Sequence, residues 1–143
     1  KIDGDLAARP LPKLKRIAWV PYADLSRRIH RADLCLGLFG AGERPSHALA
    51  NKIFQILATG TPLVTRDSPA IRQVVEPSMP GVYLIPPEDP SALADAVLTF
   101  AKDRGRLARQ ALHLDVQRRI APQAVGASFL EAIRSLLPPR QFG

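Results

Sequence analysis

The stretch from Ser46 to Val64, S-H-A-L-A-N-K-I-F-Q-I-L-A-T-G-T-P-L-V, predicts a helix, a glycine stop and a buried strand. Apolar residues recur in it at helical spacing and predict a core-facing stripe: Leu49, Ile53, Ile56 and Leu57. Gly60 stands where a left-handed residue ends a helix, and Pro62 blocks its continuation. Two starts remain open: Ser46 as N-cap gives a longer helix, and Asn51 gives one of about two turns.

The same helix carries a second, polar stripe: Asn51, Lys52, Gln55 and Thr59. Upstream, Gly40–Gly42 follows an apolar run, so the helix should start at the carboxyl end of a strand, where open α/β sheets bind ligands. Its unpaired N–H groups can hold a phosphate, Lys52 adds a charge, and Gln55 can bond sugar hydroxyls. A simply solvated polar face remains the alternative.

Composition predicts one globular domain. The chain has 143 residues, of which 46% are hydrophobic and 23% charged. No apolar run approaches the roughly 18 residues of a spanning helix, and no signal peptide opens the chain. Because it starts at Lys1 without methionine, we expect a piece of a longer protein. The single Cys35, inside an apolar run, excludes an internal disulfide and indicates a buried hydrophobe in a reducing compartment.

The net charge of +7 favours phosphates, nucleic acid or anionic membranes as partners. The arginines, however, are scattered over several predicted helices without interleaved aromatic residues. This pattern favours a solvated basic surface, with a membrane-surface role second and nucleic acid disfavoured.

Strands alternate with helices along the chain, which predicts a parallel sheet. Two early strands are expected at Ile17–Val20 and Leu34–Phe39, the second buried on both faces, with a helix between them starting at Asp24 or Ser26. A third strand begins at Leu63 and a fourth is Val82–Ile85.

Later helices have clear start signals. Ser68 and Asp89 are predicted N-caps, each followed by a proline at the first helical position. After Ser68, Ile71, Val74 and Val75 should face the core; the helix after Asp89 should bury Leu93, Val97, Phe100 and Ala101. We therefore expect an α/β fold with a Rossmann-like parallel sheet whose first strands are missing. Residues 1–143 form one partial domain, with 104–137 as a C-terminal helical extension broken near Pro122.

Known catalytic and metal motifs are lacking. His30, His47 and His113 stand far apart, and no P-loop, nucleophile elbow or G-x-G-x-x-G is present. Ser46, His47 and Asp67 could form a triad on paper, but their spacing does not support it. We predict no metal and assign no catalytic residue.

Several segments, in order, resemble one family. They are W-V-P-Y-A-D-L, R-A-D-L-C-L-G-L, K-I-F-Q-I-L-A-T-G-T-P-L-V-T, S-P-A-I-R and V-Y-L-I-P-P-E-D-P-S-A-L-A-D-A-V, between about Arg16 and Asp103. They resemble the C-terminal, donor-binding domain of GT-B glycosyltransferases of the retaining group 1, or family 4, type. The resemblance implies transfer of a sugar from a UDP- or GDP-sugar to an acceptor hydroxyl, with retention and without metal.

The site residues that the resemblance implies lie on and just before the central helix, and at the end of the first predicted strand. Two family glutamates fall at His47, toward the donor sugar, and at Gln55, toward the ribose; both are replaced here. Backbone amides of Leu49, Ala50 and Asn51 would contact sugar and phosphate. Lys52 would lie beside the α-phosphate, and Val20 and Pro21 where the base is held.

The expected partners are the nucleotide-sugar donor and an N-terminal acceptor domain absent from this chain, with no nucleic acid. The expected location is the cytoplasm, with peripheral contact at the inner membrane face as an alternative, and polysaccharide biosynthesis is the expected setting. The C-terminal helices would pack on the domain and cross back toward its missing half. Alternatives are a nucleotide-sugar epimerase of the same fold, a non-catalytic nucleotide- or partner-binding module, and a basic module on membranes or nucleic acid.

Overall fold

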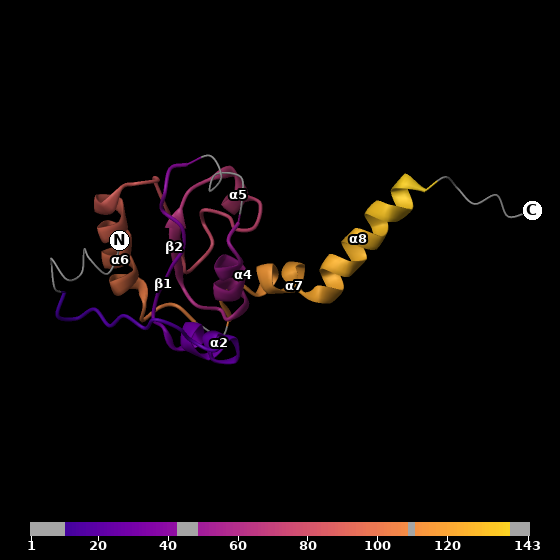
Figure 1. Ribbon diagram of the computed structural model, residues 1–143. Coiled ribbons are helices and arrows are strands. Elements are labelled where there is room, and N and C mark those ends of the chain that lie inside the picture. The colour runs from indigo at the N-terminus through magenta and orange to yellow at the C-terminus, as the bar shows by residue number, and fades with distance from the viewer. Residues whose placement is uncertain (1–10, 43–48, 109–110, 138–143) are drawn as a thin grey trace, which may run out of the picture.

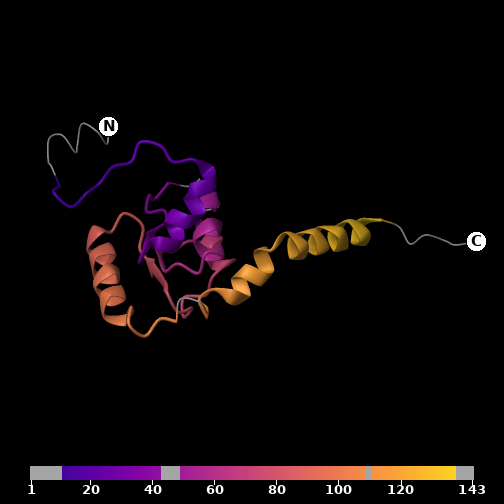
Figure 2. The same cartoon turned by 90° about the horizontal axis from the view of Figure 1, so that it is seen from below.

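A three-layer α/β arrangement is seen in the computed structural model, which describes residues 11–42, 49–108 and 111–137. Three parallel strands, β1 (Cys35–Leu36), β2 (Leu63–Arg66) and β3 (Val82–Ile85), form a sheet in the order β1-β2-β3. Helix α6 (Pro90–Asp103) covers one face and α4 (Asn51–Ala58) the other (Figures 1 and 2). The predicted fold class is confirmed.

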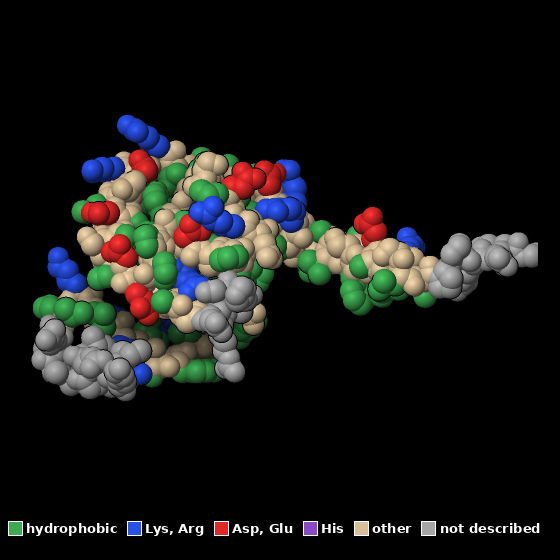
Figure 3. All heavy atoms as spheres, turned by 90° about the horizontal axis from the view of Figure 1, so that it is seen from above, with side chains coloured by type: hydrophobic (Ala, Val, Ile, Leu, Met, Phe, Trp, Pro, Cys, Tyr) green, Lys and Arg blue, Asp and Glu red, His purple; other side chains and the backbone are tan. Residues whose placement is uncertain are grey.

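The C-terminal helices leave this body of the molecule. Helix α7 (Leu114–Ile120) packs on the core through Val116, and Gln117 Nε2 donates to the Leu57 carbonyl at 3.2 Å. The chain turns at Ala121, directly before the predicted break at Pro122, into α8 (Pro122–Leu136). No residue of α8 is buried; it projects from the domain with hydrophobic side chains along one edge (Figure 3). Within the described residues, α7 therefore packs on the domain as expected, and α8 does not.

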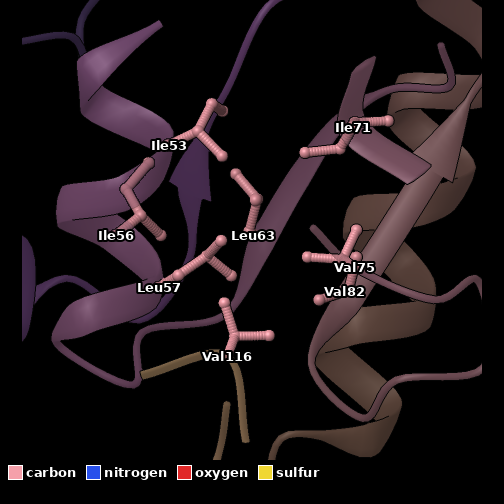
Figure 4. Close-up of a cluster of buried hydrophobic side chains, with 8 residues drawn as sticks. All are labelled: Ile53, Ile56, Leu57, Leu63, Ile71, Val75, Val82 and Val116. Atoms are coloured by element: carbon pink, nitrogen blue, oxygen red, sulfur yellow. The ribbon is translucent and has the colours of Figure 1, made fainter. Parts of the chain in front are cut away.

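The main core lies between α4 and the sheet. Ile53, Ile56 and Leu57 are almost fully buried, and Leu49 packs against them as predicted. Figure 4 shows these side chains pointing toward Leu63 of β2, with the rest of the cluster around it: Ile71, Val75, Val82 and Val116. The apolar stripe of the central stretch is thus confirmed.

The end of α4 has the geometry that its sequence predicts. Gly60 has φ 63°, and its N–H donates to the Leu57 carbonyl at 3.1 Å, while the Thr61 N–H donates to the Ile56 carbonyl at 3.3 Å. This pair of bonds is a Schellman motif, which satisfies carbonyls at the helix end. Of the two starts left open, the later one is close: Asn51 is the first helical residue and Ala50 is the N-cap.

Both predicted proline-led helices are confirmed. Ser68 Oγ accepts from the Ile71 N–H at 3.3 Å at the start of α5 (Pro69–Arg72), and Asp89 accepts from the Ala92 N–H at 2.8 Å at the start of α6. The buried stripe of α6 was predicted partly wrong. Ala96 and Phe100 are buried, whereas Val97 is 40% exposed and Ala101 is exposed, because α6 packs on β2 and β3 through its other face.

Two strand predictions need correction. The run Leu34–Phe39 is not buried on both faces: only Cys35 and Leu36 form a strand, which lies at the edge of the sheet among the described residues, and Leu36 is 52% exposed. Ile17–Val20 is not a strand, since it pairs with none of these three strands, and Trp19 is 76% exposed. The helix after it, α2 (Tyr22–Arg31), starts at Tyr22, earlier than the predicted Asp24 or Ser26, with Pro21 as N-cap. An apolar β-branched pattern is not enough for a strand without a paired neighbour.

Candidate functional site

The carboxyl ends of the three strands meet at one edge, which is where ligands bind in open α/β sheets. Three segments follow the strands there: Gly37–Gly42 after β1, Asp67–Ser68 after β2 and Pro86–Asp89 after β3. The first turn of α4 belongs to the same edge, because this helix returns from β1 to the start of β2.

Gly37 brings this edge and α4 together. A Cβ at this position would lie 2.3 Å from Thr65 Oγ1 and 3.0 Å from Ile53 Cδ1. Thr65 Oγ1 in turn accepts from the Leu38 N–H at 3.1 Å and lies 3.3 Å from the Leu38 carbonyl. Only glycine allows this close approach of β1, β2 and α4.

The Gly40–Ala41 peptide of the same segment is held by two charged side chains. Arg66, 3% exposed at the end of β2, donates from Nη1 to the Gly40 carbonyl. The Ala41 N–H donates to Glu88 Oε1 at 3.3 Å, and the Glu88 N–H donates to the Phe39 carbonyl at 2.8 Å. The segments after the strands are therefore tied to one another.

The start of α4 is open. Ala50, the N-cap, has φ −73° and ψ 143°, and no side chain among the described residues caps the helix. Asn51 and Lys52 are exposed in a first turn that contains no acidic residue. The first N–H groups of an α-helix have no partner within the helix, and together with a lysine they make this turn electropositive, which suits a phosphate.

Gln55 lies one turn further and contacts α2. Its Nε2 is 3.5 Å from the hydroxyl of Tyr22, the first residue of α2, which directly follows Pro21. A cavity of about 250 Å³ lies between the two helices; its lining includes Tyr22, Ser26, Gln55 and Thr59. The structure thus brings Gln55 close to the chain around Pro21.

The remaining predicted site residues offer mainly backbone or lie apart. Leu49 is half-buried against the core, so its side chain is engaged there, and Ala50 is half-buried as well. Val20 is half-buried and Pro21 exposed. His47 lies outside the described residues.

Sequence reasoning missed four polar residues at this edge. They are Tyr22, Arg66, Arg72 and Glu88. Arg72 forms a two-pronged ion pair with Asp67, with N–O distances of 2.6 and 2.5 Å, and this bond holds the pKa of Asp67 below its usual value. The pair lines a cavity of about 680 Å³ at the ends of β2 and β3. The signal in the sequence was the pair of charges, Arg66 and Asp67, at the end of a buried strand.

Neither a metal cluster nor a spanning helix is found in the described ranges. Those residues contain no group of three or more His, Cys, Asp or Glu side chains arranged to hold a metal ion. Each helix that the structure describes is too short or too polar to cross a bilayer.

Comparisons with known proteins agree with this fold. A family model described as glycosyl transferases group 1 matches residues 3–103. The search of curated proteins gave no match. Among solved structures, sucrose-phosphate synthase from Thermosynechococcus elongatus is similar, with a TM-score of 0.70 and 21% identity, covering 94% of this chain and 33% of that one. The chain thus spans about a third of the length of that enzyme.

The family match includes all three strands, α4 and their ligand edge, and the structural match has the GT-B fold. The resemblance drawn from the sequence is therefore confirmed, and this chain belongs to the group 1 glycosyltransferases.

Proposed function

We propose that this chain is the donor-binding part of an enzyme that transfers a sugar from a nucleotide diphosphate sugar to an acceptor hydroxyl, with retention and without metal. The family implies a nucleotide-sugar donor. The observation that carries the proposal is the arrangement on α4: a first turn that no described side chain caps, with Lys52 at the ligand edge, and Gln55 one turn deeper beside Tyr22.

The donor would lie along α4. Lys52 and the amides of Leu49, Ala50 and Asn51 would bind the diphosphate, since an open helix start and a cation stabilise negative charge. Gln55 would hydrogen-bond the ribose hydroxyls, and Val20 and Pro21 would border the base. His47 would contact the donor sugar, an assignment that rests on the resemblance alone.

Catalysis would consist of positioning and of stabilising the leaving diphosphate. The acceptor would bind to a domain outside this chain, so we expect the chain alone to bind the donor weakly and to transfer nothing. The proposed location is the cytoplasm; the net charge of +7 supports peripheral membrane contact as the alternative.

The test is binding of UDP and GDP to this chain, measured by ligand-observed NMR for the unaltered protein, Lys52→Ala and Gln55→Ala. We expect one nucleotide to bind, with affinity about three- to tenfold lower in each variant, the range of one lost hydrogen bond. Lys102→Ala is the matched control, because Lys102 is also exposed but lies in the last turn of α6, at the opposite edge of the sheet. A nucleotide affinity that is unchanged in both Lys52→Ala and Gln55→Ala would refute this site.

A further inference from the structure

The Gly40–Ala41 peptide is gripped on both sides by opposite charges. Its carbonyl accepts from Arg66 Nη1, and its N–H donates to Glu88 Oε1 at 3.3 Å. In a trans peptide the C=O and N–H point in opposite directions, so the cation and the anion hold the two ends of one peptide dipole. Glu88 adds a second bond, from its own N–H to the Phe39 carbonyl at 2.8 Å. The orientation of this exposed peptide is therefore fixed from two other segments of the ligand edge.

Both gripping residues carry an energetic penalty. Glu88 has φ 56°, the left-handed region that non-glycine residues rarely adopt. Arg66 is 3% exposed, its Nε has no hydrogen-bond partner among the described residues, and no carboxylate there pairs with it. Buried charge and strained backbone persist mainly where they serve a function. Here they coincide on one peptide at the carboxyl edge of the sheet.

The proposed function gives this peptide a place relative to the donor. If Gln55 holds the ribose and the open start of α4 holds the diphosphate, the donor runs toward the N-terminus of α4. Four residues separate Gln55 from Asn51, about 6 Å along a helix axis. The sugar must then lie beyond the helix start, on the side of the segments that follow the strands. Gly40 and Ala41 are exposed there.

We propose that Glu88 and Arg66 are positioning residues, which preset the Gly40–Ala41 peptide beside the sugar of the donor and so favour the sugar nucleotide over the bare nucleotide. This inference rests on the proposed function. It makes a distinct prediction: loss of the contacts that Glu88 and Arg66 make with this peptide weakens binding of the sugar nucleotide and leaves binding of the nucleotide unchanged.

Glu88→Gly is the informative variant, because glycine adopts a positive φ without strain. It removes the carboxylate while relieving the backbone, so we expect its thermal midpoint to be equal to or above that of the unaltered chain. A purely structural Glu88 would give the opposite, a lower midpoint and no ligand effect. Glu88→Gln keeps an acceptor oxygen and should rescue most of the binding. Glu76→Gln, at an exposed glutamate outside the ligand edge, is the matched control.

The experiment measures affinities of UDP, GDP, UDP-glucose and GDP-mannose, and hydrogen exchange of the Ala41 amide without ligand. In Glu88→Gly we expect sugar-nucleotide affinity to fall about two- to tenfold, nucleotide affinity to stay within about twofold, and Ala41 exchange to accelerate. Unchanged Ala41 exchange, or equal losses for nucleotide and sugar nucleotide, would overturn the inference. If the unaltered chain binds none of the four ligands, the proposed function fails, and with it the role in sugar selection. The hydrogen exchange of the Ala41 amide still decides whether Glu88 holds this peptide.

Discussion

Gly37→Ala should strongly destabilise the chain, because three elements meet at Gly37. The added Cβ would lie 2.3 Å from Thr65 Oγ1, 2.5 Å from Thr65 Cβ and 3.0 Å from Ile53 Cδ1. A side-chain rotation cannot relieve the contact with Thr65 Cβ, which is attached directly to the β2 backbone. The Gly37 N–H is itself bonded to the Val64 carbonyl at 2.8 Å, so β1 cannot retreat without breaking the sheet.

The expected loss follows from two effects. Overpacking a close-packed interior costs about 1–3 kcal/mol. Displacing Thr65 Oγ1 also weakens its two hydrogen bonds with Leu38, each contributing about 0.5–1.5 kcal/mol. Together the free energy of unfolding should fall by about 2–6 kcal/mol, a large share of the roughly 5–15 kcal/mol typical of a domain.

Urea unfolding measures this loss, and the thermal midpoint should fall by about 4 °C or more, at about 2–4 °C per kcal/mol. Gly40→Ala is the control: a Cβ there meets no atom within 4 Å, so the change should stay within about 0.5 kcal/mol. In a Thr65→Gly background, which removes both nearest atoms, Gly37→Ala should cost less. If Gly37→Ala is as stable as Gly40→Ala, the close approach of β1 and β2 is wrong.

Two further predictions concern titration. Burial lowers the pKa of His113 against a smaller opposing effect of the Pro80 carbonyl, so the folded chain binds fewer protons at this site than the unfolded chain. The free energy of unfolding should therefore fall as pH drops below about 6.5 and level off below the pKa of His113 in the folded chain. Asparagine tolerates the φ of 62° at this position, so His113→Asn is a suitable variant. It should reduce the slope of unfolding free energy against pH, measured by urea unfolding between about pH 7.5 and 5.5. A slope unchanged by the substitution would contradict this. The hydrogen bond from Arg72 lowers the pKa of Asp67, so Arg72→Met should raise that pKa toward its ordinary value, measured by NMR titration of the carboxyl. The exposed pair's contribution to stability, present above about pH 4 and lost as pH falls through the lowered pKa, should be small. An unmoved Asp67 titration would contradict the pairing.

Local signals predicted the fold best. The stop at Gly60 and the caps at Ser68 and Asp89 depend on residues within one turn of each other, and all have the expected geometry. Strand predictions failed where the outcome depends on a distant partner. Ile17–Val20 has strand-like residues without a paired neighbour, and β1 is a strand of only two residues at the edge of the described sheet. Apolar pattern cannot distinguish an edge strand from a central one.

The candidate site divides in the same way. Lys52 and Gln55 could be proposed from helical spacing, and the family resemblance gave them roles. Their polar surroundings could not be predicted, because Tyr22 lies 33 residues before Gln55.

The contacts of Arg66 and Glu88 with the Gly40–Ala41 peptide could be predicted even less, since these residues lie 26 and 47 residues away in the sequence. A charged residue at the end of a buried strand indicates only that its side chain makes some contact at the ligand edge. The decisive sign is conformational: Glu88 occupies a backbone region that suits glycine, which its neighbours in the sequence do not reveal. A residue kept there against its own backbone preference, with its carboxylate on a glycine-rich segment, suggests that this edge gives up some stability to hold one peptide in place.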